Sequence, residues 1–141
     1  MKKPTIKSLQ NKAENLWKEV CLLRDGRECQ IKKHYSYVKI NHSNIIQVDH
    51  CFERSNKYLF LEPANGTPLC SVCNMLKSYK KRGVDRLVDL IVRKREGDEK
   101  YKKMLEIAIS GGSNLDWDNR GWLEKRIEEL LGVRTKLEMK K

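Results

Sequence analysis

The first twenty-six residues carry one apolar stripe, which predicts a helix. Apolar side chains recur there at spacings of three and four residues, and this places them on a single helical face. They are Ile6, Leu9, Ala13, Leu16 and Val20. Pro4 lies near the expected start, and Gly26 is a turn residue at the expected end. We therefore predict an N-terminal helix within residues 1–25.

The next part of the chain has the composition of short strands and loops. YSYVKI (35–40) and NIIQV (44–48) are β-prone runs, and the turn-rich NHSN lies between them. This pattern predicts a β-hairpin whose second strand delivers Asp49 and His50 at or just beyond its end. ERSNKYLFLEPANGTP, which follows, is typical of a loop, with LFL as a short strand at most, because its prolines and glycine disfavour a helix.

A helical pattern returns in the second half of the chain. A short helix is expected to begin near Cys73, and further apolar stripes end at Gly97, at Gly111 and at Gly132. The whole chain is the size of one domain. We predict a single α+β domain over 1–141, with an N-terminal helix (1–25), a core (26–82), a helical extension (83–132) and a frayed tail (133–141).

The charge of the chain favours an anionic partner. Thirty Lys and Arg residues oppose nineteen Asp and Glu residues, which gives a formal net charge of +11 and a pI near 9.5. Such an excess on a small domain is typical of proteins that bind nucleic acid. The alternative is that the charge serves solubility alone.

Five cysteines and an unremarkable N-terminus indicate a reducing compartment. The number of cysteines is odd, the start of the chain lacks the apolar core of a signal peptide, and no window is apolar enough to span a membrane. We expect a cytoplasmic protein, in which Cys70-x-x-Cys73 indicates a metal or redox site before a disulfide. No βαβ pattern surrounds this pair, as a thiol redox protein would require.

Five residues around that pair suit the hydrolysis of a phosphodiester. The reaction needs a base for water and a hard cation for the charge on phosphate. Asp49 can bind Mg²⁺, and His50 can act as the base. Asn65 can orient the histidine, Asn74 offers a second oxygen to the metal, and Lys77 can contact phosphate. Adjacent residues of a strand point to opposite sides, so Asp49 and His50 need a bend to converge.

These residues resemble a known nuclease motif. V-D-H, then A-N-G, then C-x-x-C-N-x-x-K resembles the HNH (ββα-metal) endonuclease family over roughly residues 23–80. DHCFERSNKYLFLEPANGTPLCSVCN is similar to the phage NinG (Rap) branch of that family, which is linked to recombination and branched DNA. The resemblance implies that His50 is the general base, that Asp49 and Asn74 hold the catalytic divalent ion, and that Asn65 supports the base and its loop.

The same resemblance implies a structural zinc site with one departure from the pattern. Cys70 and Cys73 have the spacing of half a tetrahedral site. Many family members supply a further Cys-x-x-Cys after an R-D-G-R turn, but here Cys29 is followed by Lys32 at the second position. We expect His34 to complete the site. The alternatives are His42, Cys51, or a degenerate site of reduced thiols.

The sequence therefore predicts a metal-dependent DNA endonuclease. It would use Mg²⁺ or another divalent cation, with zinc as a structural ion, on double-stranded or branched DNA in the cytoplasm of a phage host or bacterium, and a homodimer is the simplest arrangement for two cuts. The expected DNA-binding residues are Arg54, Lys57, Lys77, Lys80, Lys81 and Arg82. Arg54 and Lys57 can equally belong to a solvated loop. The alternative function is a non-catalytic, zinc-dependent DNA-binding module.

Overall fold

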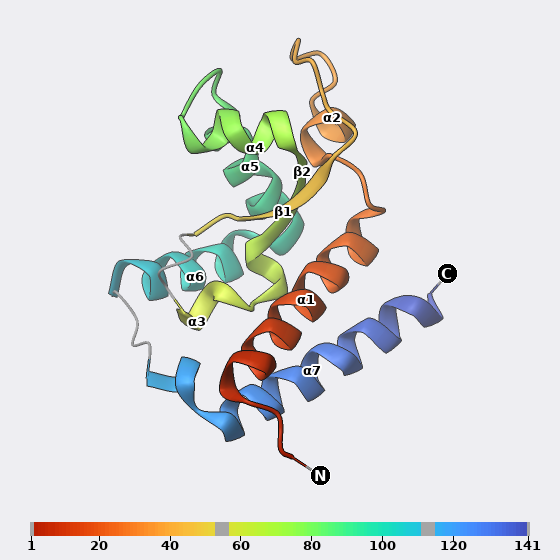
Figure 1. The fold of residues 1–141 in the computed structure, drawn as a ribbon. Coiled ribbons are helices and arrows are strands. Elements are labelled where there is room, and N and C mark those ends of the chain that lie inside the picture. The colour runs from red at the N-terminus through yellow and green to blue at the C-terminus, as the bar shows by residue number, and fades with distance from the viewer. Residues whose placement is uncertain (1, 53–56, 111–114, 141) are drawn as a thin grey trace.

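The chain is a mixed α+β protein in which helices surround a small two-stranded sheet (Figure 1). This computed structural model describes residues 2–52, 57–110 and 115–140. The α+β class that we predict is confirmed. The elements are α1 (Ile6–Asp25), α2 (Gln30–His34), β1 (Ile46–His50), α3 (Lys57–Phe60), β2 (Gly66–Cys70), α4 (Ser71–Ser78), α5 (Val84–Glu96), α6 (Asp98–Ser110), α7 (Arg120–Met139) and two 3-10 turns, Pro63–Asn65 and Leu115–Asp118.

The predicted N-terminal helix is confirmed and forms one wall of the first core. Thr5 caps α1, because its hydroxyl oxygen accepts a hydrogen bond from the backbone N–H of Ser8 at 3.0 Å. Gly26 ends the helix at φ +76°, a conformation that glycine adopts without strain. The apolar stripe of α1 packs against α7 and against Phe60 and Leu61.

The sheet pairs two segments that are distant in sequence. β1 is antiparallel to β2, with Val48 opposite Pro68 and His50 opposite Gly66. The predicted hairpin is therefore wrong, because residues 35–40 form no strand. All five residues of β2 are buried, whereas Tyr37, in the segment predicted to be the first strand of the hairpin, is 76% exposed. Burial between α1 and α4 thus outweighs the low strand propensity of GTPLC.

The helices of the second half follow the apolar pattern, with one error at the C-terminus. α5 and α6 end beside the predicted glycines, although residues 111–114 lie outside the described part. α7 instead continues through Gly132 to Met139, so the predicted tail is largely helical. Leu137 packs on the first core, and this contact explains why the helix continues.

Gly66 allows α1 to approach the sheet closely. A Cβ atom at this position would lie 2.7 Å from Cζ2 of Trp17 and would also overlap the sulfur of Cys21. Trp17 cannot move aside freely, because its indole N–H donates a hydrogen bond to the carbonyl of Glu62 at 2.8 Å. Only a residue without a side chain fits between the helix and the strand.

We predict that Gly66→Ala lowers the free energy of unfolding by about 1–3 kcal/mol, the usual cost of overpacking. Gly132→Ala is the matched control. It lies within α7 with open space around it, so alanine there is expected to be neutral or stabilising by up to about 1 kcal/mol. Urea unfolding followed by circular dichroism measures both, and equal effects would contradict the close approach.

The second core lies between the sheet and α5, and three of its members are cysteines. Cys29, Cys70 and Cys73 are buried there. The other buried members are Ile31, Leu69, Val84, Val88 and Ile91.

Among the helices that the structure describes, none has the length and apolar composition to cross a bilayer.

Candidate metal centre and the face between β1 and α4

Three cysteines and one histidine converge in the second core. The ligand atoms of Cys29, His42, Cys70 and Cys73 all lie within 4.8 Å of one another. Nδ1 of His42 is 3.4 Å from the sulfurs of Cys70 and Cys73 and 3.8 Å from that of Cys29. Tetrahedral zinc bonds to sulfur and nitrogen imply an N–S separation of about 3.6 Å. The four residues therefore fit a Cys3His zinc site.

Local secondary structure brings these ligands together. Cys70 ends β2 and caps α4, so Cys73, in the first turn of α4, lies beside Cys70. The backbone N–H of Cys73 donates to the sulfur of Cys70 at 3.4 Å. Cys29 caps α2. The loop that carries His42 is held to α4 by Ser43, whose hydroxyl oxygen lies 2.6 Å from that of Ser71.

The fourth residue of the cluster is His42 rather than the predicted His34. Nε2 of His34 lies 3.2 Å from the side-chain oxygen of Gln30, within α2. The reason for the error is the position of α2, because Cys29 precedes this helix at its N-cap, whereas His34 lies at the other end of it. His42 could have been found from the pairing of the strands, since it lies four residues before Ile46, the partner of Cys70.

The thiols of the cluster have altered acidities. Burial opposes ionisation of Cys70, but hydrogen bonds from the Cys73 backbone and from His42 outweigh it and lower its pKa to about 6. Burial raises the pKa of Cys73, and the charge of Cys29 adds to this effect. Charge on Cys29 and Cys70 thus opposes ionisation of Cys73, and a bound dication would relieve this repulsion.

The remaining two cysteines lie outside the cluster. Burial raises the pKa of Cys21 to about 12 and that of Cys51, one of the alternative ligands, to about 12. Cys21 packs in the first core. Neither cysteine has the accessible thiolate that metal binding or redox chemistry requires.

The face between β1 and α4 holds three of the predicted site residues. Nζ of Lys77 lies 2.8 Å from Oδ2 of Asp49 and donates a hydrogen bond to the carbonyl of His50 at 2.7 Å. One turn earlier on α4, the amide of Asn74 donates to the side-chain oxygen of Gln47 at 2.7 Å. Asp49 and Asn74 therefore lie on the two walls of one interface, each with a different partner.

Asp49 is held in a setting that disfavours its charge. Its side chain is only 10% exposed. Burial raises its pKa, and the ammonium of Lys77 offsets only part of that increase. A carboxylate of this kind gains from any further positive charge placed beside it.

The structure does not bring the ring of His50 to this face. His50 is 6% exposed, and its ring stacks between Trp17 at 4.2 Å and Phe60 at 4.7 Å, on the side of the sheet that faces α1. Nε2 lies 3.0 Å from the carbonyl of Phe60 and must donate, since a carbonyl only accepts. β1 stays regular through His50, so the bend that convergence with Asp49 required is absent from this strand.

Asn65 braces the loop between β1 and β2. It is fully buried, its Oδ1 accepts a hydrogen bond from the backbone N–H of Phe52 at 2.7 Å, and its amide donates to the carbonyls of Phe52 and Leu59 at 3.2 and 3.0 Å. These bonds connect Phe52 with Leu59, which both lie in the loop that Asn65 is predicted to support. Nε2 of the His50 ring instead lies 3.0 Å from the Phe60 carbonyl.

The predicted DNA-binding residues fall into two groups. Lys80, Lys81 and Arg82 are exposed on the turn after α4, close in sequence to Lys77. Arg54 lies outside the described residues, and Lys57 is described only as the first residue of α3. The turn places three cations at the end of the helix that carries Asn74.

Comparison with known proteins adds no family or fold. No family model matches the chain, and no curated protein or solved structure matches it.

Proposed function

We propose that this chain is a metal-dependent DNA endonuclease whose catalytic cation binds between β1 and α4. The observation that carries the proposal is the position of the Lys77 ammonium. It is held by the carboxylate of Asp49 and by the carbonyl of His50, one helical turn from Asn74. A positive charge is therefore already favoured beside Asp49, one of the two oxygen donors that the resemblance to HNH nucleases implies, and the other donor, Asn74, lies one helical turn away.

The donors suit a hard divalent ion. Carboxylate and amide oxygens are ligands of Mg²⁺, which binds few protein groups and keeps several waters. Such an ion, when bound, supplies charge stabilisation to the phosphate and to the leaving 3′-oxygen. Asp49 and Asn74 would hold it, while Lys77, displaced from the carboxylate, would be positioned to contact a phosphate.

The zinc site serves this face indirectly. Cys70 and Cys73 fix the junction of β2 with α4, and His42 attaches the loop that leads into β1. The cluster thus ties together both walls on which Asp49 and Asn74 lie. In this proposal zinc is structural, because all four positions of its tetrahedron are occupied by protein ligands.

The exposed cations give the proposal its substrate. Lys80, Lys81 and Arg82 lie at the end of α4, and the chain carries a net charge of +11. Contacts of this kind go to phosphates and carry little sequence information. We expect the affinity for DNA to fall steeply as salt is raised, because each neutralised phosphate releases counterions.

The base is the most demanding part of the proposal. For His50 to deprotonate water, its ring has to leave the stack between Trp17 and Phe60 and break its hydrogen bond to the Phe60 carbonyl. This burial is the specific observation that favours a second candidate, a zinc-dependent DNA-binding module without turnover. In that case His50 is a packing residue, and Lys77 permanently neutralises Asp49.

Cleavage of DNA by the purified protein separates the two candidates. We expect nicking of supercoiled plasmid in Mg²⁺ or Mn²⁺ and none without divalent cations, with linear, nicked and branched DNA compared as substrates. His50→Ala should abolish nicking while DNA binding, followed by anisotropy, is kept. DNA binding without nicking by the wild type in any divalent ion would overturn the endonuclease and support the binding module.

A further inference from the structure

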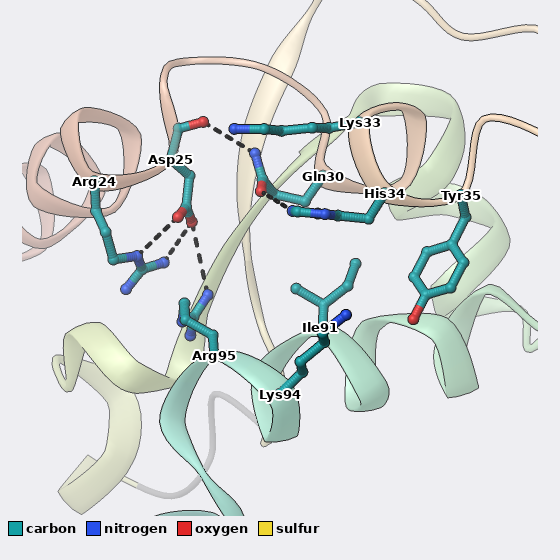
Figure 2. Close-up of a pocket in the computed structure, with 9 residues that line it drawn as sticks. All are labelled: Arg24, Asp25, Gln30, Lys33, His34, Tyr35, Ile91, Lys94 and Arg95. Carbon is teal, nitrogen blue, oxygen red and sulfur yellow. Dashed lines mark hydrogen bonds and ion pairs between the residues drawn. The ribbon is translucent and has the colours of Figure 1, made fainter.

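A cavity lies away from the face between β1 and α4. It is about 390 Å³ in volume and is lined by residues from the end of α1, from α2 and from α5 (Figure 2). Cavities that bind small ligands measure about 300–1,000 Å³, so this one is large enough for a nucleotide. Neither the zinc cluster nor Asp49 contributes to its lining.

The cavity is positively charged. Its lining includes four cationic side chains and a single carboxylate; the cations are Arg24, Lys33, Lys94 and Arg95. The carboxylate, Asp25, is already neutralised by Arg24 at 2.7 Å. Lys94 forms no ion pair with any acidic residue in the part of the chain that the structure describes. Lys33 lies 3.3 Å from Glu28, and Arg95 is paired with Glu96. Among the described residues, Lys94 is therefore the lining cation without an acidic partner, and its charge favours an anion.

The two arginines are held in place at the cavity by hydrogen bonds to backbone carbonyls. Arg24 donates hydrogen bonds to the carbonyls of Pro63 and Gly66 at 2.7 and 2.6 Å, and Arg95 donates to that of Ala64 at 2.7 Å. Nη1 of Arg95 is buried without a hydrogen-bond partner among the described residues, and the nearest acid oxygen, on Asp25, is 3.6 Å away. A buried guanidinium N–H of this kind calls for an acceptor.

The walls combine polar and apolar groups. Figure 2 shows α2 on one side of the cavity, with Lys33 and His34, and α5 on the other, with Lys94 and Ile91. Tyr35 closes one end and presents an aromatic ring. An aromatic ring and an aliphatic side chain beside several cations match a ligand that joins a phosphate to a flat base.

We infer that this cavity binds the 5′-phosphate monoester of a nucleotide, either free or at the end of a DNA strand. A terminal monoester carries up to two charges and three terminal oxygens, which suits Lys94 together with the unpartnered Nη1 of Arg95 better than an internal diester does. The inference rests on the proposed function for the choice of end, because release of a 3′-oxygen leaves a 5′-phosphate on the product. The two arginines also donate hydrogen bonds to the carbonyls on both sides of Asn65, which connects the cavity to the loop that Asn65 braces.

Binding of end-labelled oligonucleotides tests the inference. The protein carries Asp49→Asn and is kept without added divalent cations, so that the measurement does not depend on cleavage. A single-stranded decamer with a 3′-fluorophore is compared with and without its 5′-phosphate by anisotropy. We expect the phosphate to tighten binding about tenfold, the scale of one or two added charge-assisted hydrogen bonds. Competition by dTMP, beside thymidine, shows whether a free nucleotide suffices.

Two double variants with equal net charge locate the site. Lys33→Ala with Lys94→Ala should abolish the advantage of the 5′-phosphate, whereas Lys12→Ala with Lys102→Ala, exposed lysines on α1 and α6, should keep it. Displacement by dTMP but not by thymidine supports the inference. Equal affinity for both decamers together with no displacement by dTMP, or an advantage that survives loss of Lys33 and Lys94, overturns it, whatever the cleavage assay shows.

Discussion

Removing zinc is expected to unfold the half of the protein that is built around the second core. Cys29, Cys70 and Cys73 are buried together beside Leu69 and Val88, so an empty site leaves three crowded thiols inside an apolar cluster. Structural zinc contributes about 10–16 kcal/mol in small zinc domains, as much as the about 5–15 kcal/mol stability of a whole domain. Its loss cannot be absorbed by the rest of the fold.

Purified protein should contain one zinc per chain, measured by mass spectrometry of the metal. A strong chelator should abolish the cooperative thermal transition, followed by circular dichroism, and added Zn²⁺ should restore it. The first core, formed by α1 and α7, lacks the metal ligands and is expected to keep part of the helical signal. A chelated protein that melts as the untreated protein does would contradict a structural role.

The two histidines give a matched pair for this prediction. His42→Ala removes a ligand and should lower both zinc content and melting temperature, whereas His34→Ala removes only a side chain that contacts Gln30. The cysteines offer a second pair, Cys70→Ser against Cys51→Ser. Zinc retained by His42→Ala and lost by His34→Ala would show that the cluster of four is not the binding site.

The contrast between these histidines shows what the sequence can specify. The spacing of Cys70 and Cys73 is local, and a strand followed by a helix converts it directly into two adjacent ligands. The apolar stripe of α1 is local in the same way, because its period alone determines the face that is buried. These two features depend on a short stretch of chain, and both were predicted correctly.

Features that depend on distant contacts were not predicted correctly. β2 contains a glycine and a proline, and it becomes a strand because the chain is buried between α1 and α4 at that point. With the partner of β1 misassigned, the position of His42 beside Cys70 could not be deduced. The prediction that His50 and Asp49 converge depended on a bend, and pairing of His50 with Gly66 keeps the strand regular.

Asp49→Asn is expected to lower the rate of metal-dependent cleavage by at least about a hundredfold, because it removes the only charged donor proposed for the catalytic cation. Asn74→Ala should have a smaller effect, since it removes a neutral oxygen. Asp98→Asn is the matched control, an exposed carboxylate at the start of α6 that loses the same charge without touching the site. An Asp49→Asn protein that cleaves as the wild type does would exclude this carboxylate from catalysis.

Stability distinguishes loss of function from loss of structure in this variant. The pKa of Asp49 is raised in the folded protein, so the folded state disfavours the ionised carboxylate relative to the unfolded chain. The wild type therefore loses stability as pH rises through that pKa, and Asn, which never ionises, does not share this loss.

Without divalent cations, the variant should be at least as stable as the wild type at pH 7. This difference should shrink as pH falls and the wild-type carboxyl becomes protonated. Urea unfolding across this pH range measures it. A variant that is inactive but no less stable would place Asp49 in the chemistry of the site, because a residue retained for packing would show the opposite order.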